Sequence, residues 1–323
     1  MKVFVTGGNG FIGSAVVRLL IAGGHQVRCL LRQSSQTERL AELPYERVEG
    51  DIRDAAAVAR GLEGCGAVIH LASLSAWDLI DSPLMDEVVE GGTRNVLAAA
   101  TARPGTRVVF VSSILAINGS AAPYPFDETA TWTLDERELI YSRSKRQAEA
   151  LCQDAVKAGA DVVIVNPGEV YGPHDTALIT ACNLIDFAKS SPVLVCDGGT
   201  SVVHVDDVAL GVVRAMERGR RGERYILGGE NLTIKQLAEH CLSLLGQKKT
   251  ILKFPNSIIR AVAAAGKKLH LPLPFNPHVI PYATRYWFMD AGKAQRELGV
   301  SFRSARDTLA PTLAWLKESG RIA

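Results

Sequence analysis

The chain has 323 residues, 47% of them hydrophobic, and its 36 Lys and Arg nearly balance its 34 Asp and Glu, for a net charge of +2. The length and hydrophobic content allow a large core in one or two domains. The near-balance of charge excludes the excess of basic residues that is typical of a nucleic-acid-binding protein. The six cysteines are scattered without a CxxC pair, and no His, Cys or carboxylate cluster has metal-ligand spacing, so we expect reduced thiols and no metal. Without a leader-like start or an apolar run of about 20 residues, we expect a soluble, cytoplasmic protein that does not span a membrane.

Short apolar runs alternate with longer helical patterns from the N-terminus onward. The runs lie at residues 3–5, 27–31, 67–72, 107–113 and 161–166. Strands that are apolar on both faces belong in a parallel sheet that is covered by helices on both sides. The alternation therefore predicts an α/β fold with a doubly wound parallel sheet, the Rossmann arrangement.

After about residue 173 the regular alternation of apolar runs and helical patterns ends, and helical patterns predominate. We expect a dinucleotide-binding domain at 1–173 and a smaller α/β lobe at 174–323, mostly for substrate, with the chain re-entering the first domain around 200–228. Residues 251–285 hold an amphipathic helix and a proline-broken apolar loop, for which we favour core packing over a cavity wall or a membrane contact. The last helical pattern is expected to break near Pro311.

Glycines cluster in the stretch TGGNGFIG, residues 6–13, between the first strand and the first helix. The pyrophosphate of a dinucleotide needs backbone N–H donors at short range, and a helix N-terminus supplies them. Gly7 permits the tight turn, Gly10 lets a phosphate reach the main chain, and Gly13 lets the helix pack closely. Because this spacing is GxxGxxG and not GxGxxG, the prediction of nucleotide binding rests on the strand before it and the helix after it.

The end of the second strand indicates which dinucleotide is bound. An acidic residue there would bind a ribose 2′-hydroxyl, whereas an arginine accommodates a 2′-phosphate. Arg32 stands at this place in LLRQSS with no acid nearby, which favours NADP(H) over NAD(H); a solvated surface charge is the alternative. Asp51 follows the third strand and is placed to face the adenine, although Asp is also a common helix cap.

Tyr141 and Lys145 stand four residues apart in a helical pattern, so they share one face of the helix. Positive charge beside a phenol favours the phenolate and suits the tyrosine to proton transfer with an alcohol oxygen. Ser113 ends the fifth strand at the sheet edge where open α/β sheets bind ligands, and it could hydrogen-bond the same oxygen. Ser112, beside it, is expected to satisfy turn amides.

These motifs resemble the extended short-chain dehydrogenase/reductase superfamily over nearly the whole chain. The stretches that carry the resemblance are TGGNGFIG, GDIRD, VIHLAS, GTRNVLAAA, FVSSI, YSRSK, VNPGEVYGP, VVHVDDVA, YILGGENLT and DAGKAQRELG. The resemblance implies that Tyr141 is the proton donor, that Ser113 polarises the carbonyl, and that Lys145 holds the nicotinamide ribose and lowers the pKa of the tyrosine. It also implies a homodimer.

The motifs and the resemblance together give one set of expected cofactor-binding residues. They are Gly7, Gly10, Phe11, Ile12, Gly13, Arg32, Asp51, Ile52, Leu71, Ala72, Ser73, Ser112, Tyr141, Lys145, Asn166, Pro167 and Val170. Among them, Leu71, Ala72 and Ser73 would line the cofactor, and Asn166, Pro167 and Val170 would border the nicotinamide.

Two branches of the superfamily fit the sequence. FVSSI looks like dihydroflavonol reductases and 3β-hydroxysteroid dehydrogenases, whereas YILGGENLT also looks like the hopanoid-associated sugar epimerase group. Nucleotide-sugar enzymes commonly carry an arginine before HVDD to hold the diphosphate, and here Thr200 stands in about that place. Val89 takes the place of an asparagine that family members often have, which puts an Asn-supported proton relay in doubt and points to a core residue.

We therefore expect an NADP(H)-dependent reductase or dehydrogenase acting on an apolar carbonyl or secondary alcohol, of dihydroflavonol-like, steroid-like or other ketone type. A nucleotide-sugar epimerase or dehydratase with tightly held NAD(P) is the alternative, and a non-catalytic dinucleotide-binding regulator is a third hypothesis, against which the tyrosine and lysine argue.

Other polar residues have more ordinary interpretations: His70 is expected to be a core histidine whose ring nitrogens are hydrogen-bonded, and His204 to cap a helix. Trp77, Trp132 and His174 fall in loops near the carboxyl edge of the sheet and are secondary candidates for contact with the substrate.

Overall fold

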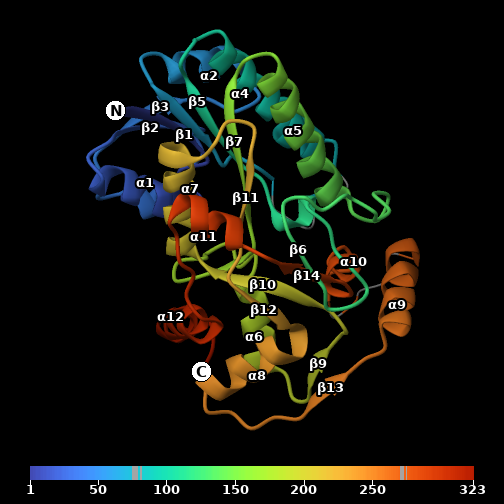
Figure 1. Ribbon diagram of the computed structural model, residues 1–323. Helices are drawn as coiled ribbons and strands as arrows, with labels where there is room; N and C mark the ends of the chain where they lie inside the picture. The colour runs from blue at the N-terminus through green and yellow to red at the C-terminus, as the bar shows by residue number, and fades with distance from the viewer. Residues whose placement is uncertain (75–78, 81, 270–272, 274) are drawn as a thin grey trace.

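A parallel sheet forms the centre of the larger lobe (Figure 1). The computed structural model describes residues 1–74, 79–80, 82–269, 273 and 275–323, and within these residues seven strands pair in parallel throughout this sheet. In spatial order they are β11 (Arg224–Leu227), β7 (Asp161–Pro167), β5 (Arg107–Val111), β4 (Ala67–His70), β1 (Lys2–Thr6), β2 (Gln26–Leu31) and β3 (Tyr45–Glu49). The predicted doubly wound sheet is confirmed.

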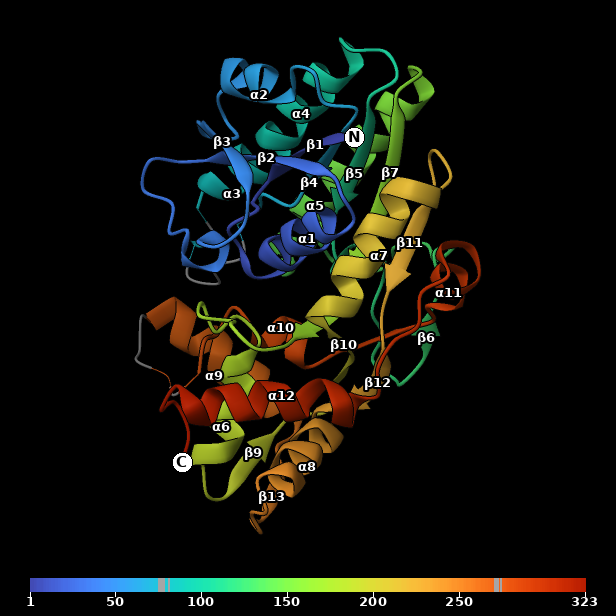
Figure 2. The same cartoon turned by 90° about the vertical axis from the view of Figure 1, so that its left-hand side faces the viewer.

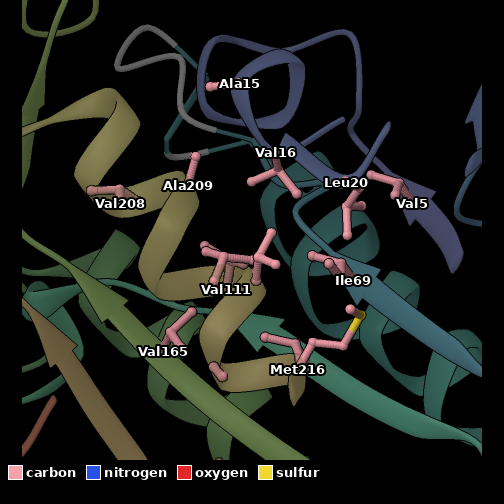
Figure 3. Close-up of a cluster of buried hydrophobic side chains, with 14 of the residues drawn as sticks. Val5, Ala15, Val16, Leu20, Ile69, Val111, Val165, Val208, Ala209 and Met216 are labelled. Atoms are coloured by element: carbon pink, nitrogen blue, oxygen red, sulfur yellow. The ribbon is translucent and has the colours of Figure 1, made fainter. Parts of the chain in front are cut away.

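Helices cover both faces of the sheet, as Figure 2 shows. On one face lie α1 (Phe11–Ala22) and α7 (Val205–Arg218), and on the other lie α2 (Ala55–Leu62), α4 (Gly92–Thr101) and α5 (Ile140–Lys157). In β1, Val3 and Val5 belong to the first buried cluster, which is drawn in Figure 3, and Phe4 belongs to the second. The strand is continuously apolar because neither of its faces meets water.

The smaller lobe is built on shorter strands. Among the described residues, a five-stranded sheet joins β12 (Glu230–Thr233), β10 (Gly199–His204), β14 (Tyr286–Met289), β6 (Pro125–Phe126) and β8 (Glu169–Tyr171), and a two-stranded ribbon pairs β9 (Val193–Val195) with β13 (Ile251–Lys253). The helices of this lobe are α6 (Ala181–Lys189), α8 (Ile234–Leu244), α9 (Asn256–Leu269), α10 (Ile280–Ala283) and α12 (Ala305–Glu318). A third buried cluster fills the space between α6, α8 and α12.

Shorter elements complete the fold. They are α3 (Leu84–Asp86), the π-helical turn Glu87–Gly91, the 3₁₀ turns Glu38–Leu40 and Ile114–Ala116, and α11 (Gly292–Leu298), which packs on α7 and β11. After β10, the chain returns to the larger lobe through α7 and β11, so segments far apart in sequence share the main sheet. The domain boundary at residue 173 stays a prediction.

Two expectations from the sequence are wrong. The last helix does not break, because α12 runs through Pro311; Leu309, Leu313 and Leu316 are buried along it, and this packing outweighs the backbone hydrogen bond that a proline cannot make. The amphipathic segment is not core either: most of α9 is exposed, and Ala263 and Gly266 are its buried residues. An apolar stripe shows that a helix has two faces, but not whether the apolar face meets a core or a cavity.

The order of the strands fixes where a ligand can lie. From β1 the chain runs outward to β2 and β3, then crosses back to β4, β5 and β7 on the other side. At such a switch point the loops that follow neighbouring strands diverge and leave a crevice at the carboxyl edge of the sheet. The turn at Gly7, directly after β1, lies at this crevice.

Candidate active site

The turn between β1 and α1 brings two stretches of backbone into direct contact. Gly7 has a φ of +73°, and a Cβ on it would lie 2.7 Å from the Ala72 nitrogen, in the loop after β4. A Cβ on Gly13 would lie 2.0 Å from the Gly7 carbonyl oxygen. Neither position can carry a side chain, so α1 begins directly against the turn and the loop after β4.

The start of α1 fits the pyrophosphate of a dinucleotide. Gly10 is the N-cap and supplies no side-chain hydrogen bond, so the first backbone N–H groups of the helix have no internal partner. Phe11, Ile12 and Gly13, which carry these groups, line the cavity described next. A Cβ on Gly10 would come within 4 Å of one atom alone, the Gly7 oxygen at 3.2 Å, so the space above it is open. Unpaired donors, the helix dipole and open space together make an anion site.

One cavity of about 1350 Å³ extends from this turn along the carboxyl edge of the main sheet into the smaller lobe. It gathers nearly all of the residues predicted from the sequence as cofactor-binding or catalytic. Those that line it are Gly7, Gly10, Phe11, Ile12, Gly13, Arg32, Asp51, Ile52, Leu71, Ala72, Ser73, Ser112, Ser113, Tyr141, Lys145, Pro167 and Val170. Asn166 is not among the lining residues and lies behind the wall.

Tyr141, in the first turn of α5, stands in the cavity wall next to Ser113. Burial raises the pKa of Tyr141 to about 12, and a hydrogen bond with the Ser113 side chain opposes that rise. The Tyr141 backbone N–H donates to the Tyr282 hydroxyl at 3.1 Å, which ties the start of α5 to the smaller lobe. At neutral pH the phenol therefore holds its proton and can donate it to an oxygen in the cavity.

Lys145 lies one helical turn further along α5. Its side chain is 2% exposed, and its Nζ donates to the Val111 carbonyl oxygen at 3.1 Å and lies 5.9 Å from the centre of the Tyr141 ring. Burial lowers the pKa of Lys145 to about 8, and the charge of Glu149 opposes that fall. Below that pH the side chain is an ammonium, and a positive charge at this distance can stabilise a tyrosinate.

A buried polar group supports this face of α5; sequence reasoning named its member Asn166, as a residue beside the nicotinamide, but missed Glu149 and Arg224. The side-chain N–H of Asn166 donates to a Glu149 carboxylate oxygen at 2.6 Å and to the Ser113 carbonyl oxygen at 2.9 Å. Arg224 of β11 pairs with the other Glu149 oxygen at 3.3 Å. Burial raises the pKa of Glu149, and the positive charge of Arg224 opposes this. The group fixes the backbone of Ser113; the four-residue step from Lys145 to Glu149 was the signal that could have revealed it.

The far end of the cavity carries cationic side chains. Arg32 follows β2, has an exposed side chain and makes no ion pair with a described residue. Asp51 is held by Arg53, whose Nε lies 2.9 Å from a carboxylate oxygen, and this contact lowers the pKa of Asp51. Arg39, which sequence reasoning also missed, donates to the backbone oxygens of Asn9 and His174. No local pattern marks Arg39, because those partners come from distant parts of the chain.

Both histidine interpretations hold. His70 is 1% exposed and lies between the Thr6 hydroxyl at 2.7 Å and the Thr93 hydroxyl at 3.1 Å, and burial lowers its pKa to about 3, so it is a neutral core residue. His204 caps α7 by accepting a hydrogen bond from the Asp206 backbone N–H. Val89 is 1% exposed and packs in the core, as expected.

Two of the three aromatic candidates lie outside the cavity wall. Trp132 and His174 are not lining residues of the cavity; the Trp132 ring packs under the Arg146 guanidinium, and the His174 ring lies 6.0 Å from that of Trp315. Trp77 lies outside the described residues.

The end of the cavity in the smaller lobe is apolar and acidic. Phe254, Ile258, Val262 and Phe275 are among its lining residues, together with the buried Thr200. Its charged lining residues are acids without exception among the described residues; they are Glu169, Asp175 and Asp186. The basic lining residues all belong to the larger lobe; they are Arg32, Arg39 and Arg53, which follow strands of the main sheet, and Lys145 on α5.

Fold and site together define an oxidoreductase that depends on a nicotinamide dinucleotide. The family model for the NAD dependent epimerase/dehydratase family matches residues 3–228, and the chain belongs to this family. The expected resemblance to the extended short-chain dehydrogenases is confirmed. Among the described residues, no three or more His, Cys, Asp and Glu side chains gather as metal ligands, and all six cysteines are free thiols.

The similar proteins include both a named reductase and a named nucleotide-sugar dehydratase. The chain is 32% identical to a putative dihydroflavonol 4-reductase of Synechocystis, over 99% of this chain and 95% of that one, and 31% identical to sterol demethylase protein B of Methylococcus capsulatus over the whole of both. A solved structure of the dTDP-glucose 4,6-dehydratase DesIV (double mutant) from Streptomyces venezuelae, with NAD and DAU bound, is 27% identical and superposes with a TM-score of 0.78 over 98% of this chain and 97% of that chain.

The anion site at Gly10 can be tested without knowing the substrate. In Gly10→Ala the new methyl group would enter the space above the first turn of α1 at the cost of a small shift of the Gly7 oxygen, 3.2 Å away, so dinucleotide affinity should fall at least ~10-fold while the melting temperature falls only slightly. Isothermal titration calorimetry measures this. Gly66→Ala is the control, because its Cβ would meet only the tip of Met1 at 3.7 Å. Unchanged affinity in Gly10→Ala would place the phosphates elsewhere.

Proposed function

We propose that this protein is an NADP(H)-dependent reductase or dehydrogenase acting on the carbonyl or secondary alcohol of an uncharged, apolar small molecule. The observation that carries the proposal is that Ser113, Tyr141 and Lys145 meet in the wall of one cavity, between a cationic end and an apolar end. The cationic end suits a phosphorylated dinucleotide, and the apolar end suits a hydrophobic substrate.

The chemistry follows from the three side chains. A bound nicotinamide would supply the hydride to the carbonyl carbon. Tyr141 gives its phenolic proton to the carbonyl oxygen, so that a C–H and an O–H bond form as the C=O π bond breaks. Ser113 donates a hydrogen bond to the same oxygen, and Lys145 stabilises the tyrosinate until it regains a proton from solvent. In the oxidative direction each step reverses.

NADP(H) is favoured over NAD(H) because Arg32 forms no ion pair with an acid in the described part of the chain, although its charge helps to lower the pKa of Asp51. An unpaired guanidinium at the end of β2 suits a 2′-phosphate, with which it forms charge-assisted hydrogen bonds. The nearby Asp51 is already engaged by Arg53.

A nucleotide-sugar epimerase or dehydratase is the second candidate, favoured by the DesIV structure and by the name of the family. Against it, the smaller lobe offers no lining Lys or Arg among the described residues, and Thr200 stands in place of a diphosphate-holding arginine. A substrate diphosphate there would meet Glu169, Asp175 and Asp186, and Arg39, which reaches this end from the loop after β2, is already engaged by the His174 oxygen and by the charge of Asp175. A non-catalytic regulator is disfavoured because the serine, tyrosine and lysine are assembled. A homodimer and a cytoplasmic location stay predictions.

Tyr141→Phe tests the catalytic assignment. A panel of apolar ketones and of diphosphosugars is first screened by NADPH absorbance. We expect turnover with the ketones. A protein that retains its cofactor and shows no net turnover of ketones would favour the epimerase. With the best substrate, removing the phenolic proton should lower kcat ~10²- to 10⁴-fold and leave NADPH affinity within about twofold. Tyr124→Phe, at an exposed tyrosine, is the control. Undiminished turnover in Tyr141→Phe would refute the role.

Arg32→Asp tests the choice of dinucleotide. Loss of the guanidinium contact, and repulsion by the new carboxylate, should weaken NADPH at least ~10-fold and NADH far less, as measured by calorimetry. Arg18→Asp, which makes the same charge change on the exposed face of α1, is the matched control. Equal losses for both dinucleotides would contradict the phosphate role.

A further inference from the structure

Exposed apolar side chains concentrate on one part of the smaller lobe. Of the nine large hydrophobic side chains that are exposed among the described residues, six belong to α9, its lead-in and the β9–β13 ribbon. We call these six the α9 patch; they are Leu194, Leu252, Phe254, Ile258, Val262 and Leu269. Such a concentration marks an interaction surface, because exposed hydrophobic residues are otherwise scattered singly.

The patch is a continuous feature and not a frayed end. Leu194 and Leu252 are direct register partners across the ribbon, so they lie side by side on one face. Ile258, Val262 and Leu269 fall on one side of α9, since residues four and seven apart share a helix face. Figure 1 shows α9 at the edge of the molecule, away from the main sheet.

The opposite side of α9 is anchored, so the helix is fixed with its apolar side outward. Asn256 donates to the Asp197 carbonyl oxygen at 2.7 Å, and Arg260 pairs with Glu138 at 2.5 Å. Ala263 is buried, and Gly266 packs so closely on Leu273 that a Cβ would lie 2.5 Å from its methyl group.

The chain segment that carries five of the six patch residues has charges of one sign, although Lys253 pairs with Asp197 at 2.9 Å and Arg260 with Glu138. Residues 240–289 contain no Asp or Glu, in a chain whose charges otherwise nearly balance. The same stretch contains seven basic residues: Lys248, Lys249, Lys253, Arg260, Lys267, Lys268 and Arg285. Lys248, Lys253, Lys267 and Lys268 are exposed. Apolar side chains on a helix flanked by lysines are the pattern of a surface that lies on an anionic bilayer, and none of the described helices is long and apolar enough to cross one.

The patch also borders the active-site cavity. Leu194, Phe254, Ile258 and Val262 are both exposed and part of the cavity lining, so they form its rim. A bilayer that covered the patch would meet the cavity at this rim, and an apolar molecule dissolved in the bilayer could enter without crossing water.

We infer that the α9 patch is a membrane-docking surface, which holds the mouth of the cavity against an anionic lipid bilayer and admits a membrane-dissolved carbonyl substrate to Tyr141. Docking stands on the patch itself, whereas the route of substrate entry rests on the proposed function. Leu252 and Leu269 belong to the patch but do not line the cavity, so they can be changed without altering the site.

Sedimentation with vesicles tests the docking. The wild-type chain should bind vesicles that contain phosphatidylglycerol, bind pure phosphatidylcholine vesicles much less, and lose binding as salt rises. The double variant Leu252→Ser/Leu269→Ser should bind the anionic vesicles at least ~10-fold more weakly, because two large apolar side chains no longer enter the bilayer. Tyr124→Ser is the matched control, because Tyr124 is as exposed as Leu269, at 62%, and lies outside the patch.

Two results of the vesicle experiment would overturn the inference: no binding of the wild type to anionic vesicles, or equal binding by the double variant. A patch that instead joins two copies of the chain would show as a dimer in solution that the double variant dissociates without any vesicle binding, which also overturns it. NADPH oxidation with a short, water-soluble ketone should be the same in the wild type and the double variant. If neither the wild type nor the double variant oxidised NADPH, the proposed function would be contradicted, whereas the conclusion from vesicle binding would be unaffected.

Discussion

The structure depends on a backbone-to-backbone contact between the first turn of α1 and the turn that precedes it. That contact exists because residues 7 and 13 have no side chain: a Cβ on Gly13 would lie 2.0 Å from the Gly7 oxygen. It starts α1 at the centre of the main sheet, where the chain reverses its direction of travel across the strands. The N–H groups of the first turn of α1 thereby face the cavity, and they share one edge of the sheet with Ser113, Tyr141 and Lys145, for which we propose the catalytic roles.

The cavity is divided by charge, and this division carries the functional argument further than the fold does. Cations line it along the main sheet, whereas apolar side chains and acids line it in the smaller lobe. Folds of this kind host epimerases, dehydratases and reductases alike, so the sheet alone cannot separate them. The absence of a lining cation in the described part of the smaller lobe favours an uncharged substrate. On its outer surface the smaller lobe carries an apolar rim that lysines flank, in contrast to the acids inside the cavity.

Local patterns in the sequence were enough to predict the sheet, the glycine turn and the pairing of Tyr141 with Lys145. Each of these is set by neighbours within a few residues: apolar runs, a strand followed by glycines, and a four-residue step on a helix. Glu149 and Arg39 were missed because their roles arise from partners on other strands and loops, such as Asn166 with its bonds to Glu149 and to the Ser113 backbone.

The two wrong expectations have the same cause. Pro311 lies inside a helix because buried leucines hold that helix in place, and the apolar side of α9 meets a cavity and solvent instead of a core. In both segments the sequence pattern was recognised, but its surroundings were decided by tertiary packing.

The central claim is that one cavity brings a dinucleotide bound at Gly10 to the hydroxyl of Tyr141. A crystal structure of the protein with NADP⁺ tests it most directly. The account requires the pyrophosphate on the first turn of α1, the 2′-phosphate beside Arg32 and nicotinamide C4 facing the space next to Tyr141. A dinucleotide bound away from α1, or one whose nicotinamide ring lies outside reach of Tyr141, would contradict it.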